Sequence, residues 1–310
     1  MKSHPTDHKS GALNRSAALA SIAVAALLVA LKAWAALQTG SAAMLGSLAD
    51  TVLDLVASLA TLAGVWVAAQ PEDGNHRFGH GKAEALAAMF QVTLISLSAL
   101  VLAFHSVDQL LSGSRTAAAQ DGIVVSLIAM AATLALLAWQ RHVIRRTGSL
   151  AISTDHVHYK SDLALNLAVI AALALEQFGG ITGADALLGL AIAVWLGWGA
   201  WRASQAAINQ LMDGEWPDEK RRRFVKVMAR HPELRGVHDL RTRTSGNRDF
   251  VQFHVWVDPE MTIRQAHTVM DEIEIKLRAE FPGIEILIHP DPEGHVDTGL
   301  GAKDLLPAQP

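Results

Sequence analysis

The chain has 310 residues, of which 51% are hydrophobic and 18% charged, and its formal net charge is −4. The charged fraction lies below the about 25% of an average soluble protein, and the lack of a basic stripe argues against a nucleic-acid partner. The chain contains no cysteine, which excludes disulfides and thiolate metal sites and leaves nitrogen and oxygen as the ligands of any bound metal.

Six long apolar runs fill the first two thirds of the chain and are joined by short polar segments. Each run reaches the about 20 residues that a helix needs to cross about 30 Å of hydrocarbon, and six such runs disfavour the alternative of buried helices in a soluble protein. The runs cover residues 16–37, 42–69, 83–112, 121–140, 150–177 and 183–211. They predict a cytoplasmic N-terminal tail at residues 1–13 and an all-α membrane domain of six transmembrane helices at residues 14–212.

The short loops between these runs differ in their content of lysine and arginine. Basic residues gather in the N-terminal tail and in the second and fourth loops, whereas the first and fifth loops have none and the third has only Arg115. Because basic loops stay in the cytoplasm, we predict a multi-pass protein of the cytoplasmic membrane with both termini in the cytoplasm.

Two of the predicted spans carry ionisable residues in pairs. Asp50 and Asp54 in the second run are four residues apart, and so are His158 and Asp162 in the fifth. Residues at this spacing share one face of a helix. At least a dozen mostly apolar residues follow each pair, which places all four side chains well inside a span.

These acids are costly unless something neutralises them. Each charge at mid-bilayer costs about 2.5–3.5 kcal/mol on insertion scales. Lys160 lies on another helix face, and Lys32 is expected to extend toward the membrane surface. A missing cation explains the set best, and two pairs supply the four ligands that zinc takes in tetrahedral sites. Protonated acids in a bundle core and a metal-free proton relay are the alternatives.

The loop between the second and third runs offers a second group, Asp73, His76 and His80. Gly74, Gly79 and Gly81 would let the loop fold around one metal. Histidines in polar loops are also commonly just solvated, so spacing alone leaves this site open.

The composition becomes charged from residue 213 onward. A helix at 217–234, a hairpin at 236–259, a second helix at 262–281 and a strand at 283–292 predict an αββαβ domain of the α+β class at residues 213–294. The second helix is expected to bury Ile263, Ala266, Met270, Ile273 and Leu277. A polar tail at residues 295–310 is expected to be disordered.

The histidines of this domain fall on the face of the sheet opposite its core. His254 alternates with Phe253 and Val255, and His289 alternates with Ile286 and Ile288. Alternation with period two directs them away from the helix-covered face. From this pattern alone they are either surface residues or ligands.

Seven ordered motifs resemble the cation diffusion facilitator family, and within it the bacterial zinc and ferrous-iron efflux transporters. The motifs are GSLADTVLD, NHRFGHGKAEALAA, HYKSD, HDLRTRTSG, VQFH, QAH and IHPDP. They run from about residue 12 to residue 294. This resemblance implies a homodimer in the bacterial inner membrane, with six spans per subunit and a ferredoxin-like cytoplasmic domain.

The resemblance also implies the roles of the candidate ligands. The transported metal would bind Asp50, Asp54, His158 and Asp162, and a loop site would fall on Asp73, His76 and His80. A cytoplasmic binuclear site, holding Zn²⁺ as a structural or regulatory ion, would fall on His238, His254, His267, His289 and Asp291, with Asp291 as the bridging ligand.

The expected activity is proton-coupled antiport that exports a divalent metal, Zn²⁺ above all, by alternating access. Fe²⁺, Cd²⁺ or Mn²⁺ as the main substrate and a passive metal channel remain as alternatives. A membrane metalloenzyme is disfavoured because the chain has neither a His-Glu-x-x-His motif nor a cysteine, so no enzymatic activity is expected. Asp155, near the face of His158, belongs either to the metal or proton path or to a helix N-terminus.

Overall fold

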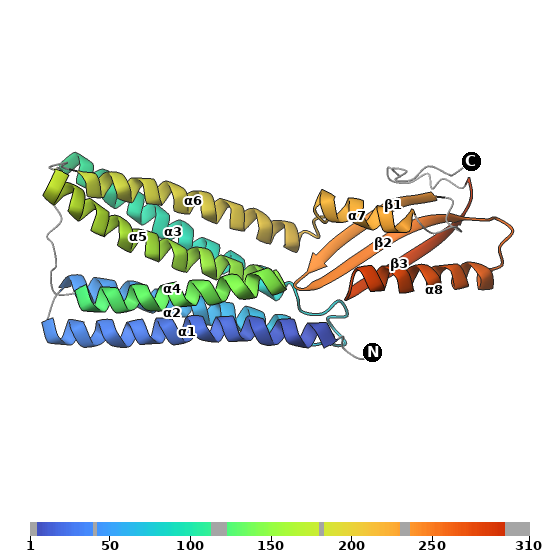
Figure 1. Cartoon of the computed structure of the whole chain (residues 1–310), viewed down its shortest axis with the longest axis horizontal. Helices are drawn as coiled ribbons and strands as arrows, with labels where there is room; N and C mark the ends of the chain where they lie inside the picture. The colour runs from blue at the N-terminus through green and yellow to red at the C-terminus, as the bar shows by residue number, and fades with distance from the viewer. Residues whose placement is uncertain (1–4, 40–41, 113–122, 180–182, 230–235, 295–310) are drawn as a thin grey trace. The chain divides into compact units, whose positions relative to one another are not determined.

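The computed structural model describes residues 5–39, 42–112, 123–179, 183–229 and 236–294. The chain forms two compact units that divide between Ile208 and Asn209 (Figure 1). The predicted disordered tail at residues 295–310 lies outside the described residues. We describe each unit by itself.

The first unit is built from six long helices that run lengthwise beside one another (Figure 1). They are α1 (Pro5–Thr39), α2 (Ala42–Ala68), α3 (Ala83–Ser112), α4 (Ile123–Thr147), α5 (Leu150–Gly179) and α6 (Ala184–Leu211). Helix α1 begins inside the predicted N-terminal tail, because Pro5 has a backbone suited to the first helical position.

Four of these helices contain a described stretch that is long and apolar enough to cross a membrane. The stretches are Ser10–Trp34, Asp50–Ala68, Ala83–Ser112 and Ala186–Leu211. The first half of helix α5 carries three charged residues, Asp155, Lys160 and Asp162. Two of the predicted metal ligands, His158 and Asp162, lie in this same half of α5.

Small residues bring the membrane helices close together. A Cβ on Gly64 of α2 would lie 2.4 Å from the Cβ of Ala87 on α3, and a Cβ on Gly189 of α6 would lie 2.5 Å from Ser106 Oγ on α3. In a membrane, helices associate mainly through such close packing. Lipid tails are as apolar as the side chains, so the hydrophobic effect does not drive helices together there. Helix α3 thus contacts α2 at one glycine and α6 at another.

The second unit is a small α+β domain with the predicted αββαβ order. It contains α7 (Asp218–Met228), β1 (Gly236–Ser245), β2 (Arg248–Val257), α8 (Ile263–Glu280) and β3 (Ile284–Pro292). The sheet order is β1-β2-β3, with β2 antiparallel to β1 and parallel to β3. Gly246 provides the positive φ of 61° that the tight β1–β2 turn requires.

Both helices of this unit cover one face of the sheet. Phe224 of α7 packs edge-on against Phe253 of β2 at a centroid distance of 5.5 Å, and Ile273 and Leu277 of α8 complete the core. The predicted stripe of α8 is wrong at its first position. Ile263 is 89% exposed because it lies in the first turn beyond the sheet, directly after the Thr262 cap, and Val269 is buried in the core.

Candidate functional site

The predicted ligands of α2 and α5 meet inside the membrane unit. His158 Nε2 lies 2.9 Å from Asp54 Oδ1 and 3.8 Å from Asp162 Oδ2. One ligand atom from each of the three residues lies within 4.8 Å of the others. His158 is buried at 8% exposure, and the two carboxylates are partly buried. Two carboxylates facing one imidazole form a compact nitrogen and oxygen donor set for a divalent metal.

Asp50 does not join this group. It lies one helical turn before Asp54 on α2 and its side chain is exposed. A fourth ligand from Asp50 would therefore require a change of its rotamer or a small movement of α2.

Lys32 of α1 lies beside the acids of this group. Its ammonium donates a hydrogen bond of 2.6 Å to Thr51 Oγ1 and interacts electrostatically with Asp54, Asp162 and Asp50. The contact arises because Thr51, one residue after Asp50, is buried on α2 where Lys32 of α1 can reach it. The acids of the site thus face one lysine as well as His158.

Asp155 is not a helix N-terminal acid but a fully buried junction between helices. Its Oδ2 accepts hydrogen bonds from Ser21 of α1 and Gln140 of α4, at 2.6 Å and 2.7 Å, and its Oδ1 accepts one of 2.7 Å from Gln91 of α3. Four helices therefore meet at this carboxylate, three residues before His158. Glutamines inside otherwise apolar runs were the sequence signal for this network.

A second buried carboxylate, Glu84, was not foreseen. It accepts hydrogen bonds from Asn14 Nδ2 at 3.1 Å, from Ser149 Oγ at 2.6 Å and from the backbone N–H of Leu150 at 3.1 Å. An acid at a helix N-terminus complements the helix dipole. Glu84 therefore joins the start of α3 to α1 and to the start of α5.

The loop residues Asp73, His76 and His80 come together as predicted. Asp73 Oδ1 lies 3.1 Å from His76 Nδ1, and Asp73 Oδ2 lies 3.3 Å from His80 Nε2. The two imidazole rings are 4.5 Å apart. The backbone N–H of His76 donates to Asp73 and holds the pKa of that carboxyl below its usual range. Gly79, with φ of 78°, turns the chain so that His80 returns to Asp73.

In the C-terminal unit, Asp291 gathers histidines from three strands. His254 Nδ1 lies 2.8 Å from Asp291 Oδ2, and His238 Nε2 lies 3.2 Å from the same oxygen. His289 Nε2 lies 3.4 Å from the other oxygen, Oδ1. The strand register explains the convergence, because His238, His254 and His289 are direct neighbours across the sheet.

His238 also tests whether a metal fits. It is 3% exposed, yet neither of its ring nitrogens makes a hydrogen bond of acceptable geometry within the described residues. A buried imidazole with its nitrogen aimed at a shared carboxylate suits a metal ligand, because a buried polar atom otherwise needs a partner. The nitrogen and oxygen donors therefore fit Zn²⁺. One carboxylate oxygen of Asp291 faces His238 and His254, and the other faces His289.

His267 stays outside this group. It lies on α8, which covers the opposite face of the sheet, and it is exposed with its Nδ1 3.3 Å from Asp271 Oδ2. Within one subunit, the cytoplasmic cluster thus contains four of the five predicted residues.

Two family models together match nearly the whole chain. A model of the cation efflux transmembrane domain matches residues 18–212, and a model of the cytoplasmic domain of cation efflux proteins matches residues 216–293.

Similar proteins are found among bacterial cation-efflux pumps. The pump FieF of Cronobacter sakazakii is 42% identical over 286 residues, which cover 92% of this chain and 95% of the pump. FieF of Pectobacterium atrosepticum is 43% identical over 276 residues, with 89% and 92% covered. A solved structure of a candidate zinc transporter, CzrB, in its zinc form is 34% identical, with a TM-score of 0.26, and covers 27% of this chain and 96% of that chain.

Proposed function

Because the chain belongs to the cation diffusion facilitator family of divalent-metal efflux transporters, we propose that it exports Zn²⁺ from the cytoplasm in exchange for protons. The observation that carries this proposal is the group of Asp54, His158 and Asp162, which joins α2 and α5 inside the membrane unit. Members of this family are transporters, so the alternative of a membrane metalloenzyme is excluded.

The donor set favours zinc. Imidazole and carboxylate ligands suit Zn²⁺, which prefers four ligands in a tetrahedron. Three ligands are already close together, and Asp50 or a water molecule completes the set. Fe²⁺, Cd²⁺ and Mn²⁺ remain candidate substrates because they accept the same donor types.

Proton exchange follows from the same ligands. A metal binds only deprotonated carboxylates and neutral imidazole, so metal and protons compete for Asp54, His158 and Asp162. His158 takes part in this competition because an imidazole binds metal only when it is neutral. Alternating access of this group to the two sides of the membrane then couples metal export to proton import.

The two peripheral clusters bind metal that is not in transit. We assign Asp73, His76 and His80 to one ion and His238, His254, His289 and Asp291 to a zinc pair that Asp291 bridges. A bound zinc pair supplies cross-links between β1, β2 and β3, and its binding energy stabilises the folded domain.

The topology and assembly follow from the loop charges and the second family model. We propose that both termini lie in the cytoplasm of a bacterial inner-membrane protein and that the cytoplasmic domain pairs two subunits in a homodimer.

Flux measurements in proteoliposomes test the proposed function. Wild-type protein should transport Zn²⁺ faster when the proton gradient favours exchange, whereas a passive channel would be insensitive to that gradient. Asp54→Ala and Asp162→Ala should abolish flux, while Asp108→Ala, which removes an exposed acid of α3, should not. Wild-type flux from either site variant would contradict the assignment, and repeating the assay with Fe²⁺, Cd²⁺ and Mn²⁺ ranks the substrates.

A further inference from the structure

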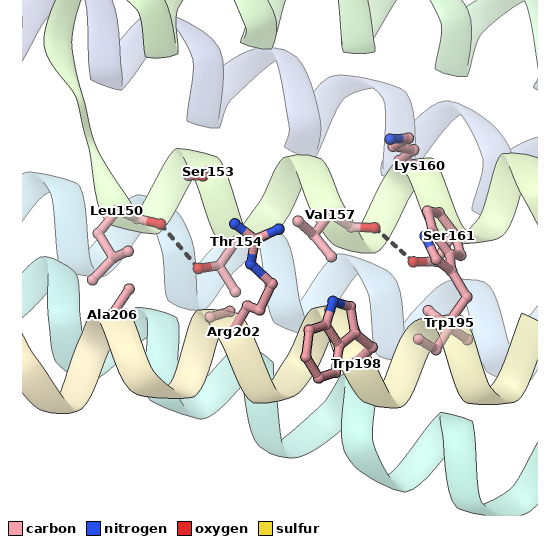
Figure 2. Close-up of a pocket in the computed structure, with 13 residues that line it drawn as sticks. Leu150, Ser153, Thr154, Val157, Lys160, Ser161, Trp195, Trp198, Arg202 and Ala206 are labelled. Atoms are coloured by element: carbon pink, nitrogen blue, oxygen red, sulfur yellow. Dashed lines mark hydrogen bonds between the residues drawn. The ribbon is translucent and has the colours of Figure 1, made fainter.

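None of the residues of the three candidate metal clusters lines a cleft between α5 and α6. Its volume is about 370 Å³, and it is lined by residues 150–161 of α5 and residues 195–206 of α6 (Figure 2). It begins at Leu150, the first residue of α5, and continues along the helix to Ser161. Such a volume is typical of a site for a small organic ligand.

Two cations line this cleft and no acid does. Lys160 of α5 and Arg202 of α6 are both exposed, and within the described part of the chain neither forms an ion pair. Figure 2 shows Arg202 reaching from α6 toward Thr154 on α5. Two unpaired positive charges would repel a divalent metal, so the cleft does not serve the transported ion. They attract an anion instead.

The remaining lining combines apolar and aromatic side chains with the hydroxyls of Ser153, Thr154 and Ser161. Trp195 and Trp198 of α6 are 40% and 62% exposed, and the Lys160 ammonium lies 5.4 Å from the centroid of the Trp195 ring. Tryptophan with arginine or lysine is typical of the region where lipid headgroups meet acyl chains. The hydroxyls of Thr154 and Ser161 already donate to the backbone carbonyls of Leu150 and Val157, so the cations remain as the charged donors.

We propose that this cleft binds an anionic phospholipid, with Lys160 and Arg202 attracting its anionic headgroup and the two tryptophans contacting its acyl chains. Basic pockets between membrane helices commonly recognise such headgroups. A zwitterionic headgroup fits less well, because it brings its own cation toward two others. The site depends on the membrane location of α5 and α6 and not on the identity of the transported metal.

Fluorescence quenching by brominated lipid tests the site in full-length protein reconstituted into phosphatidylcholine vesicles with a minority of phosphatidylglycerol. In separate samples, one of the two lipids carries bromine on its acyl chains. The fluorescence of Trp198→Phe is subtracted from that of the wild type, so that the difference reports the quenching of Trp198 alone. Wild-type Trp198 should be quenched preferentially by brominated phosphatidylglycerol. Each cation should contribute about fivefold to the preference, so Lys160→Gln with Arg202→Gln should lose most of it.

Two further variants serve as matched controls. Arg145→Gln with Arg146→Gln removes the same charge from exposed positions of α4 and should retain the preference. Lys160→Arg with Arg202→Lys keeps the charge in the cleft and should retain it as well. Equal loss in the two charge-removing variants would reduce the effect to general surface attraction and overturn the proposal.

Other outcomes point to a different occupant and also overturn it. If inorganic phosphate or glycerol 3-phosphate relieves the quenching in wild-type protein, the cleft is a soluble-anion site. If neither brominated lipid quenches Trp198, a second copy of the chain or another part of the protein covers the cleft.

Discussion

Three acids of the membrane unit show how the neighbours of a carboxylate decide its role. Asp155 accepts three hydrogen bonds from neutral side chains, so it can remain buried without a metal. Asp54 and Asp162 instead face the same imidazole from two helices. Like charges that converge on one site are stabilised by a cation, which supports our proposal that Asp54 and Asp162 bind the metal and that Asp155 has a positioning role.

We expect Asp155→Ala to lower the stability of the membrane unit. The change removes a buried acceptor that Ser21, Gln91 and Gln140 share, and the loss of hydrogen bonds at a buried site costs about 1–3 kcal/mol. Thermal unfolding of the detergent-solubilised protein measures the effect. Asp108→Ala is the control for removing an exposed acid, and equal melting temperatures for the two variants would contradict the hydrogen-bonded role.

At the loop cluster, we expect metal binding to weaken on acidification through the histidines rather than through Asp73. The lowered pKa of Asp73 keeps its carboxylate ionised as the pH falls, whereas imidazole in general takes up a proton between about pH 8 and 5. Equilibrium dialysis with Zn²⁺ measures this in a background of Asp54→Ala, His254→Ala and His289→Ala. Asp73→Asn should weaken binding at every pH, and a shifted midpoint in that variant would contradict the prediction.

At the scale of elements, α5 is held at two levels before it reaches its metal ligands. Glu84 binds its first turn, and Asp155 fixes its second turn to three other helices. The facing ligand, Asp54, belongs to α2, whose position depends on the contact between Gly64 and Ala87 on α3. The distance between the two halves of the site is thus set by helix packing.

We therefore expect Gly64→Val to lower both stability and transport. The new side chain would start 2.4 Å from the Cβ of Ala87 and push α2 from α3, at a cost of about 1–3 kcal/mol. Gly197→Val is the matched control, because a Cβ at Gly197 of α6 meets nothing within 4 Å. Zinc flux and melting temperature should fall in the first variant only. Equal behaviour of the two would show that the α2–α3 contact is not needed.

For the whole molecule, the periodicity of hydrophobic residues predicted the helices and strands well, but it predicted their tertiary contacts poorly. The six apolar runs form helices and the C-terminal unit has the predicted αββαβ order. Both could be predicted because hydrophobic residues repeat with a different period in helices and in strands. The i, i+4 pairs on α2 and α5 also identified three of the residues that meet, Asp54, His158 and Asp162, whereas Asp50 stays outside the group.

The features that the sequence did not predict are the contacts that each helix face makes with other parts of the fold. The contact of Lys32 with Thr51 and the hydrogen bond of Glu84 to the start of α5 were not foreseen. Ile263 has the correct spacing for the core of the C-terminal unit but lies beyond the end of the sheet. Each of these features depends on a neighbour distant in sequence, which a pattern along one helix cannot supply.

The C-terminal cluster yields a prediction about the whole transporter. His238, His254, His289 and Asp291 lie outside the membrane helices, so metal held there is not the metal that crosses. Binding energy at such a site becomes folding or assembly energy. We expect His254→Ala with His289→Ala to lower the stability of the cytoplasmic domain in Zn²⁺ and to raise the zinc concentration at which transport begins.

The comparison that decides this role is flux against zinc concentration for that double variant beside Asp54→Ala. The double variant should regain proton-coupled flux at high zinc, because Asp54, His158 and Asp162 are intact, whereas Asp54→Ala should remain inactive at every concentration. Removal of zinc by a chelator should lower the melting temperature of the wild type and leave that of the double variant nearly unchanged. If the folded, membrane-inserted double variant is inactive at all zinc levels, these histidines lie on the obligatory path of the metal and the regulatory role is wrong.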